Sequence, residues 1–294
     1  MMQFKLKTLM AEFQLKMALT PIVDVSTEEH KARNVGFILL AVSLGFVFGP
    51  LAGGLLSDTH LASWCNEATP MFFAAVVSLL NAGLLAKYFK ETFTSTRAIK
   101  IRIQLAIEIF AAAFKNKNIR MLSLVLLIFI SGWGEYFGFM SQFLLRRFHY
   151  SALETSLFMM VMACGFSIGF GFLVDYCAKR FNLKRCVCIA LFIGSAICLM
   201  TALSYTPWII WCSTVFLGIV IAIAYSILIT MFSNQVSAEE QGWVMGVTNA
   251  IMALSFGVTT FFSGFVAYFD ESLPIFWAFL GMLISAIILW RSGL

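Results

Sequence analysis

Long apolar segments dominate this sequence, and most of them are about as long as the hydrocarbon layer of a membrane is thick. A helix that crosses a bilayer needs about 20 apolar residues, and it satisfies its own backbone hydrogen bonds in lipid. Eight such segments follow one another: 35–56, 70–88, 121–144, 156–174, 186–203, 208–231, 244–267 and 273–290. The chain is 61% hydrophobic and 12% charged, whereas soluble domains are about half apolar and a quarter charged. We therefore exclude a water-soluble globular fold and predict an all-α integral membrane protein with about eight transmembrane helices.

The distribution of positive charge predicts how these helices are oriented. If the N-terminus is cytoplasmic and the loops alternate, all Lys and Arg residues except Arg146 and Arg147 lie on the cytoplasmic side. Cytoplasmic loops carry an excess of Lys and Arg. Both termini are therefore expected in the cytoplasm.

One long connection, residues 89–119, separates the second span from the third. It is basic, and its segment 101–114 is amphipathic because Arg102, Gln104 and Glu108 interrupt the apolar residues. Charges of this kind are costly inside a bilayer, so we expect a helix on the cytoplasmic surface. A ninth span is the alternative.

The chain also contains a short internal sequence repeat. The sequence VSTEE at 25–29 precedes the first span, and VSAEE at 236–240 precedes the seventh, each followed closely by a glycine, Gly36 and Gly246. Chance is one explanation, since Ser-x-x-Glu is a common helix start. If the repeat is real, the first two spans correspond to the last two, and the chain has a 2 + 6 arrangement that lacks four spans of the first half.

The first span carries a stripe of small residues. Gly45, Gly49 and Gly53 recur every fourth residue, so they form a flat face that a second helix can approach closely. Pro50 removes one backbone donor and predicts a kink. This pattern suits a hinge or seal between two helical bundles, and it equally suits an ordinary packing stripe.

The complete spacing of this span resembles the antiporter motif of the major facilitator superfamily, in its drug:proton antiporter branch of tetracycline and multidrug exporters. The motif residues are Gly36, Gly45, Gly49, Pro50, Gly53 and Gly54. The segment that begins at Pro70 and contains Asn81 is similar to the next span of that family. A second motif resembles the family's cytoplasmic loop signature, and it comprises Gly171, Asp175, Lys179 and Arg180.

This resemblance covers residues 18–294 and implies the last two-thirds of a twelve-span transporter in the plasma (inner) membrane. It implies a cytoplasmic segment 1–34, two spans of the N-terminal bundle in 35–88, a basic linker 89–119 and a six-span C-terminal bundle 120–294. The implied function is secondary active export of a small lipophilic or drug-like solute, coupled to protons, by alternating access. The alternative is a truncated, transport-incompetent remnant or membrane scaffold of the same family. A partner that supplies the missing helices is not identified by the sequence.

The candidate transport residues are polar groups inside predicted spans. Glu135 lies about 22 Å along its helix from Arg120 and about 16 Å from Arg146, which places it near mid-membrane. Ionisable residues at that depth usually face a cavity. Trp133 and Tyr136 on the same helix suit a lipophilic cation. A Glu that pairs with a neighbour or opens to the outer vestibule is the alternative reading.

Three uncharged polar residues lie in other spans: Asn81, Tyr225 and Asn249. Each either lines a substrate path or bonds a neighbouring helix. Hydrolytic triads, nucleotide-binding glycine loops and zinc-spaced His clusters do not occur in the sequence. We therefore predict neither an enzyme nor a bound metal or cofactor, and no nucleic acid partner; the expected partners are the bilayer, a small-molecule substrate and protons.

Overall fold

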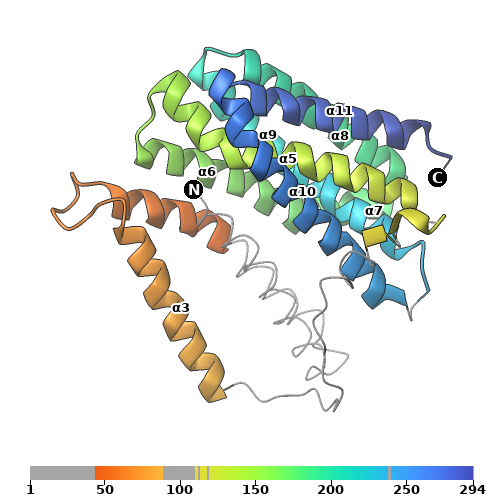
Figure 1. The fold of residues 1–294 in the computed structure, drawn as a ribbon, viewed down its shortest axis with the longest axis horizontal. Coiled ribbons are helices and arrows are strands. Elements are labelled where there is room, and N and C mark those ends of the chain that lie inside the picture. Colours follow the sequence, from red (N-terminus) through yellow and green to blue (C-terminus); the bar gives the residue numbers. More distant parts are fainter. Residues whose placement is uncertain (1–43, 89–109, 112, 118, 238–239, 294) are drawn as a thin grey trace. The chain divides into compact units, whose positions relative to one another are not determined.

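The computed structural model describes residues 44–293 except 89–109, 112, 118 and 238–239. It contains a helix, Leu44–Ser57, followed by the elements α3 (Thr69–Tyr88), α5 (Arg120–Phe148), α6 (Ala152–Ile168), the π-helix η1 (Gly169–Leu173), α7 (Val174–Arg180), α8 (Leu183–Leu203), α9 (Pro207–Ser233), α10 (Gln241–Phe269) and α11 (Leu273–Arg291) (Figure 1). Because α6, η1 and α7 form one continuous rod, seven of the described helices are long and apolar enough to cross a membrane. The predicted all-helical membrane fold is confirmed.

The predicted spans correspond to these helices from the second span onward. The helices are longer than the apolar segments, since α5 ends at Phe148 and the rod that begins with α6 continues to Arg180. The first predicted span is described only over Leu44–Ser57, where the helix continues through Pro50. Residues 1–34 with the first copy of the repeat, Gly36 and most of segment 101–114 lie outside the described residues.

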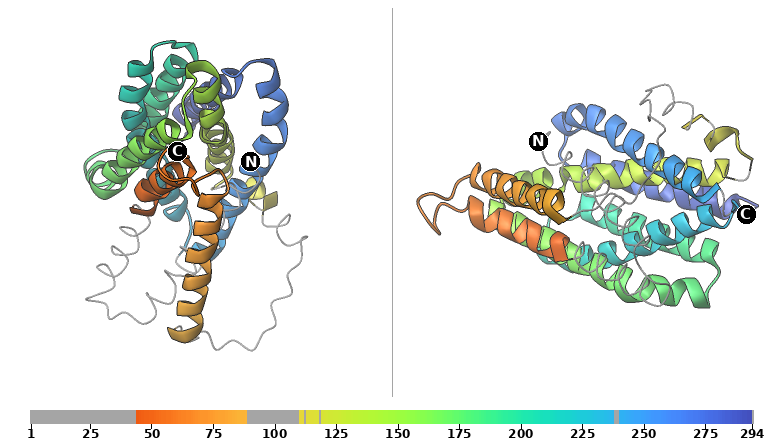
Figure 2. Two further views of the ribbon diagram at one scale, coloured as in Figure 1. Left: turned by 90° about the vertical axis from the view of Figure 1, so that its left-hand side faces the viewer. Right: turned by 90° about the horizontal axis from the view of Figure 1, so that it is seen from below.

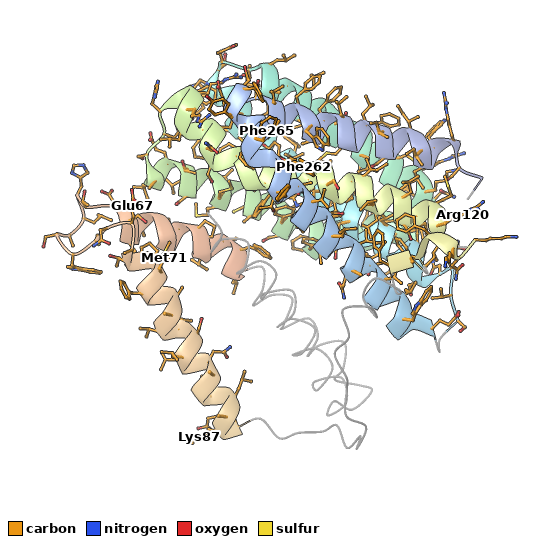
Figure 3. The ribbon with its side chains drawn as sticks, viewed as in Figure 1. Glu67, Met71, Lys87, Arg120, Phe262 and Phe265 are labelled. Carbon is orange, nitrogen blue, oxygen red and sulfur yellow. The ribbon has the colours of Figure 1, made fainter. Side chains whose placement is uncertain are left out.

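The chain divides into two compact units. The first comprises the residues up to Lys100 together with Ala152–Met160, and the second comprises Ile101–Ser151 with Val161–Leu294. In the first unit, a Cβ placed on Gly54 would lie 2.5 Å from the Cβ of Ser156. The helix α3 buries none of its residues, and its side chains project outward between Met71 at one end and Lys87 at the other (Figure 3).

Helix α5 is the most buried long helix of the second unit, and α10 and α11 both pack against it (Figure 2). The approach is close because small residues meet at the crossings. A Cβ on Gly132 would lie 3.2 Å from the carbonyl oxygen of Ala278 and from the Cα of Gly281 on α11. Serine hydroxyls add ties between helices, as in many membrane bundles: Ser285 donates to the carbonyl of Val125 at 3.3 Å.

Local signals set the ends of several helices. Pro207 and Pro274 stand in the first turns of α9 and α11, where the missing N–H costs nothing. The side chain of Asn182 accepts from the backbone of Arg185 and caps α8. His149 ends α5 in the left-handed region, with φ 55°, and its N–H donates to the carbonyl of Leu145 at 3.1 Å.

Candidate functional site

Four aromatic rings contact one another in series, beginning on α5. Trp133 stacks on Tyr136 with ring centroids 5.7 Å apart and meets Phe166 of α6 edge-on at 5.7 Å. Phe166 in turn stacks on Phe170 of η1 at 6.1 Å. Tyr136 is fully buried, whereas Phe170 is 43% exposed. This aromatic ladder (Tyr136, Trp133, Phe166 and Phe170) therefore leads from the core of the second unit to its surface.

Glu135 is buried, at 5% exposure, in the middle of α5. Its direction follows from its glycine neighbours: Gly132 faces α11, and Gly134 faces α10, where an added Cβ would lie 3.1 Å from the ring of Phe256. With about 100° of rotation per residue, Glu135 lies about 60° from Gly132 and about 100° from Gly134. Glu135 is therefore directed between α10 and α11.

The structure does not bring Glu135 onto the face that holds Trp133, because residues two apart on a helix do not face each other. Its neighbours at helical spacing are Ser131, Gly138 and Gln142, which are all partly exposed, whereas the face with Tyr136 is buried. We call these three residues, together with Glu135, the polar stripe of α5. A carboxyl group in such a stripe can take up a proton or hold a cation, since ionisable side chains at membrane depth commonly serve these roles.

Tyr225 on α9 and Asn249 on α10 both belong to the second unit. The Tyr225 hydroxyl on α9 lies 3.3 Å from the sulfur of Met252 on α10, and Asn249 is one turn away from Met252 on the same helix face. Both polar residues are half-buried. Asn81 is exposed on α3 of the first unit.

The motif glycines of the first span differ in their surroundings. An added Cβ would meet nothing within 4 Å at Gly45, Gly49 or Gly53 among the residues described, whereas at Gly54 it would collide with the Cβ and Oγ of Ser156. Pro50 is half-buried in the same helix. The described contacts therefore account for one glycine, Gly54, as a packing residue.

The expected loop signature is helical rather than a loop. Gly171 belongs to η1, and Asp175 and Lys179 on α7 form an ion pair of 2.7 Å between exposed side chains. An acid four residues before a base supports a helix at this point. The guanidinium of Arg180 lies 5.8 Å from the ring of Tyr176. The connection between α7 and α8 thus shortens to Phe181 and Asn182.

At the other end of α5, Arg147 makes a cluster that the sequence did not predict. Its guanidinium pairs with Glu271 at 3.2 Å and donates to the carbonyl of Ala202 at 2.7 Å. The rings of Phe143 and Tyr205 lie 4.9 and 4.7 Å from it. The sequence did carry one indication of this cluster. Arg146 and Arg147 are the two basic residues that do not fall on the predicted cytoplasmic side, so acidic or carbonyl partners within the protein could have been expected for them.

The loop beside this cluster holds a carboxyl group with a shifted pKa. Hydrogen bonds from the side chain and the backbone of Ser272 lower the pKa of Asp270, and the charge of Arg147 lowers it further. Within the described ranges, no three His, Cys, Asp or Glu residues gather closely enough to hold a metal ion. The chemistry of the described residues is thus that of one buried carboxyl, aromatic rings and hydroxyl or amide groups.

Comparison with known proteins gives a consistent result. Residues 10–260 match the model of the Major Facilitator Superfamily. Multidrug resistance protein 1 of Bacillus subtilis (strain 168) is 23% identical over 92% of this chain and 68% of its own length. Multidrug resistance protein 2 of the same organism is 20% identical over 79% of this chain and 57% of its own length. The chain therefore spans between 57% and 68% of the length of these two relatives.

A solved structure agrees with the fold. The structure of the human organic anion transporter MFSD10 (TETRAN) superposes with a TM-score of 0.64 at 16% identity, over 94% of this chain and 67% of that one. At this identity, the likeness concerns the fold.

Proposed function

The chain belongs to the Major Facilitator Superfamily, a family of membrane transporters and not of enzymes, and from that premise we propose that it exports a small lipophilic or drug-like solute in exchange for protons. Two multidrug resistance proteins among its relatives support the substrate class. The expected mechanism is alternating access, in which two helical bundles rock about a central site. The partners of such a protein are the bilayer, the solute and protons.

In the proposed topology the protein lies in the plasma (inner) membrane, and both of its termini are in the cytoplasm. Residues 1–34 form a cytoplasmic segment, 35–88 two spans of the first bundle, 89–119 a basic linker and 120–294 the second bundle of six spans. The charge distribution supports this arrangement, since Arg120 and Arg180 then face the cytoplasm. Arg146 and Arg147 lie on the outer side, where they bind groups of the protein itself.

The buried carboxyl of Glu135 is the observation that carries the proposal. A carboxyl group in the middle of a transmembrane helix is costly and marks a proton or cation pathway. We assign Glu135 the role of proton or substrate group, and Trp133, Tyr136, Tyr225, Asn249 and Asn81 the role of candidate lining residues. The glycines and Pro50 of the first span are proposed to shape the seal between the bundles.

The proposal is tested with the purified chain in liposomes that contain tetraphenylphosphonium, a lipophilic cation. An imposed proton gradient is expected to drive efflux in the wild-type protein. Glu135→Gln is expected to abolish it, because an amide does not take up and release a proton as a carboxyl group does. Glu154→Gln, which changes an exposed carboxyl in the first turn of α6, is the matched control and should retain efflux. Unchanged efflux in Glu135→Gln would remove this residue from the mechanism.

The competing proposal is a transport-incompetent remnant or membrane scaffold of the same family. The share of the relatives' length that the chain spans motivates it. It predicts a folded protein that gives no proton-driven efflux in the same liposomes. Efflux by the wild-type chain would reject it.

A further inference from the structure

The rod from Ala152 to Arg180 changes its winding in the middle. At η1 the backbone N–H of Val174 donates to the carbonyl of Gly169, five residues earlier, instead of four. A π-turn of this kind accommodates one extra residue in an α-helix, and such turns occur often at functional sites. The bulge therefore shifts the helical register of α7 by one residue relative to α6.

The α6 side of the bulge is held tightly. A Cβ on Gly165 would lie 2.2 Å from the carbonyl oxygen of Val215, and one on Gly169 would lie 2.6 Å from the Cβ of Ala222. On the facing helix, a Cβ on Gly218 would lie 2.5 Å from the carbonyl oxygen of Met162. These close approaches define a glycine seam between α6 and α9 (Gly165, Gly169 and Gly218), in which the two helices pack without room for larger side chains.

The α7 side is held loosely. None of its residues is buried. Its charged side chains interact within the helix: Lys179 pairs with Asp175, and Arg180 lies over Tyr176. α7 also neighbours α8 and α9, and the thiol of Cys186 on α8 lies 3.9 Å from the carbonyl oxygen of Cys177. A helix with few buried contacts is free to move at low cost.

We propose that η1 is a pivot about which α7 turns relative to the glycine seam during transport, and that Gly165, Gly169 and Gly218 are positioning residues for this motion. If the π-turn relaxes to α-helix with all its residues present, α7 rotates by one residue, about 100°. Asp175, Lys179 and Arg180 then change direction together, while the aromatic ladder stays anchored at Phe166. This inference rests on the proposed transport function.

Single-residue deletions in the bulge test the pivot. Deleting Gly171, where an added Cβ meets nothing within 4 Å, should turn the rod into a regular α-helix in which α7 keeps its observed direction. The rotated orientation of α7 is then no longer available. Deleting Phe172, which is 75% exposed, should act in the same way and guards against a variant that fails to fold. Phe172→Leu keeps the residue count and is the control.

Two measurements separate the pivot from the transport function. Amide hydrogen exchange, followed by mass spectrometry on the detergent-solubilised protein, should slow about tenfold over residues 170–174 in either deletion and change little in Phe172→Leu. Efflux of tetraphenylphosphonium from liposomes should be lost in both deletions and kept in Phe172→Leu. Exchange that is unaffected by deletion, or efflux that survives it, would overturn the proposal. A wild-type chain without efflux would refute the transport function, while the exchange result would still decide whether the bulge is mobile.

Discussion

The guanidinium of Arg147 and the carboxylate of Glu271 form an ion pair of 3.2 Å in which the arginine side chain is only 7% exposed. The pair connects the end of α5 to the loop between α10 and α11. Because Arg147 also donates to the carbonyl of Ala202, it ties the end of α8 to the same point. The Arg147 side chain thus joins the ends of α5 and α8 to the loop between α10 and α11, although these segments lie far apart in the sequence.

Replacing Arg147 with Ala is expected to destabilise the second unit by about 2 kcal/mol, because charge-assisted hydrogen bonds are lost and a buried carbonyl is left without its donor. Arg147→Lys should recover part of this loss, since an ammonium keeps the charge but not the forked geometry. Thermal unfolding of the detergent-solubilised protein, followed by tryptophan fluorescence, measures both. Arg146→Ala, which removes a single hydrogen bond to Ala267, should have a smaller effect, and an equal effect would contradict the special role of Arg147.

The first span offers a matched pair of adjacent glycines. Gly54→Ala should destabilise the first unit by about 1–3 kcal/mol because overpacking forces a backbone shift, here against Ser156 and the backbone of Leu153. Gly53→Ala has open space in the described structure and should be tolerated. The measurement is the melting temperature in detergent. Adding Ser156→Gly to Gly54→Ala should restore stability, and a double variant as unstable as Gly54→Ala alone would exclude the Ser156 contact as the cause.

The pattern of apolar residues was enough to predict the helices, because the bilayer imposes both their length and their hydrogen bonding. The segments 70–88 and 273–290 correspond closely to α3 and α11. Hydropathy could not predict η1, since a π-turn has the same composition as the helix around it. It also placed Asp175 and Lys179 in a loop because charges were taken to end the span, although the helix continues past them.

The site was predictable in part. The depth of Glu135 followed from its distance to the flanking charges, and the structure does bury it. Helical spacing alone would have separated Glu135 from Trp133, because residues two apart point in different directions. The partners of Arg147 and Trp133 could not be predicted, since Glu271 and Phe166 come from distant parts of the sequence and depend on tertiary packing.

The loop between α10 and α11 should respond to acid. The pKa of Asp270 lies below its usual value of 3.8 because Ser272 donates two hydrogen bonds to the carboxylate. A lowered pKa means that the ionised form stabilises the fold, so the contribution is fully present above about pH 4 and is lost as the pH falls through the folded-state value. Ser272→Ala should raise the pKa of Asp270 and move this loss to higher pH.

Thermal unfolding measured at a series of pH values between about 3 and 7 tests the effect of Ser272→Ala. The matched control is Ser204→Ala, since Ser204 also stabilises a helix connection but bonds to the backbone of Thr206 and to no carboxylate. The acid limb of the stability curve should shift in Ser272→Ala and stay in place in Ser204→Ala. Identical acid limbs in the two variants would show that Asp270 does not contribute through Ser272.

The two faces of α5 predict two kinds of variant. Tyr136 is fully buried in the second unit, so Tyr136→Ala should cost about 3–5 kcal/mol, the range for large aromatic truncations in a core, and should lower the yield of folded protein. Gln142 belongs to the partly exposed polar stripe with Glu135, so Gln142→Ala should change stability by no more than about 0.5 kcal/mol.

If the stripe lines the transport path, Gln142→Ala should nevertheless reduce efflux of tetraphenylphosphonium per folded molecule. Measuring efflux and melting temperature on the same samples separates the two effects, because a packing role lowers both together, whereas a role in the path lowers efflux alone. A Gln142→Ala protein with wild-type efflux would move the path away from this face of α5 and toward the aromatic ladder.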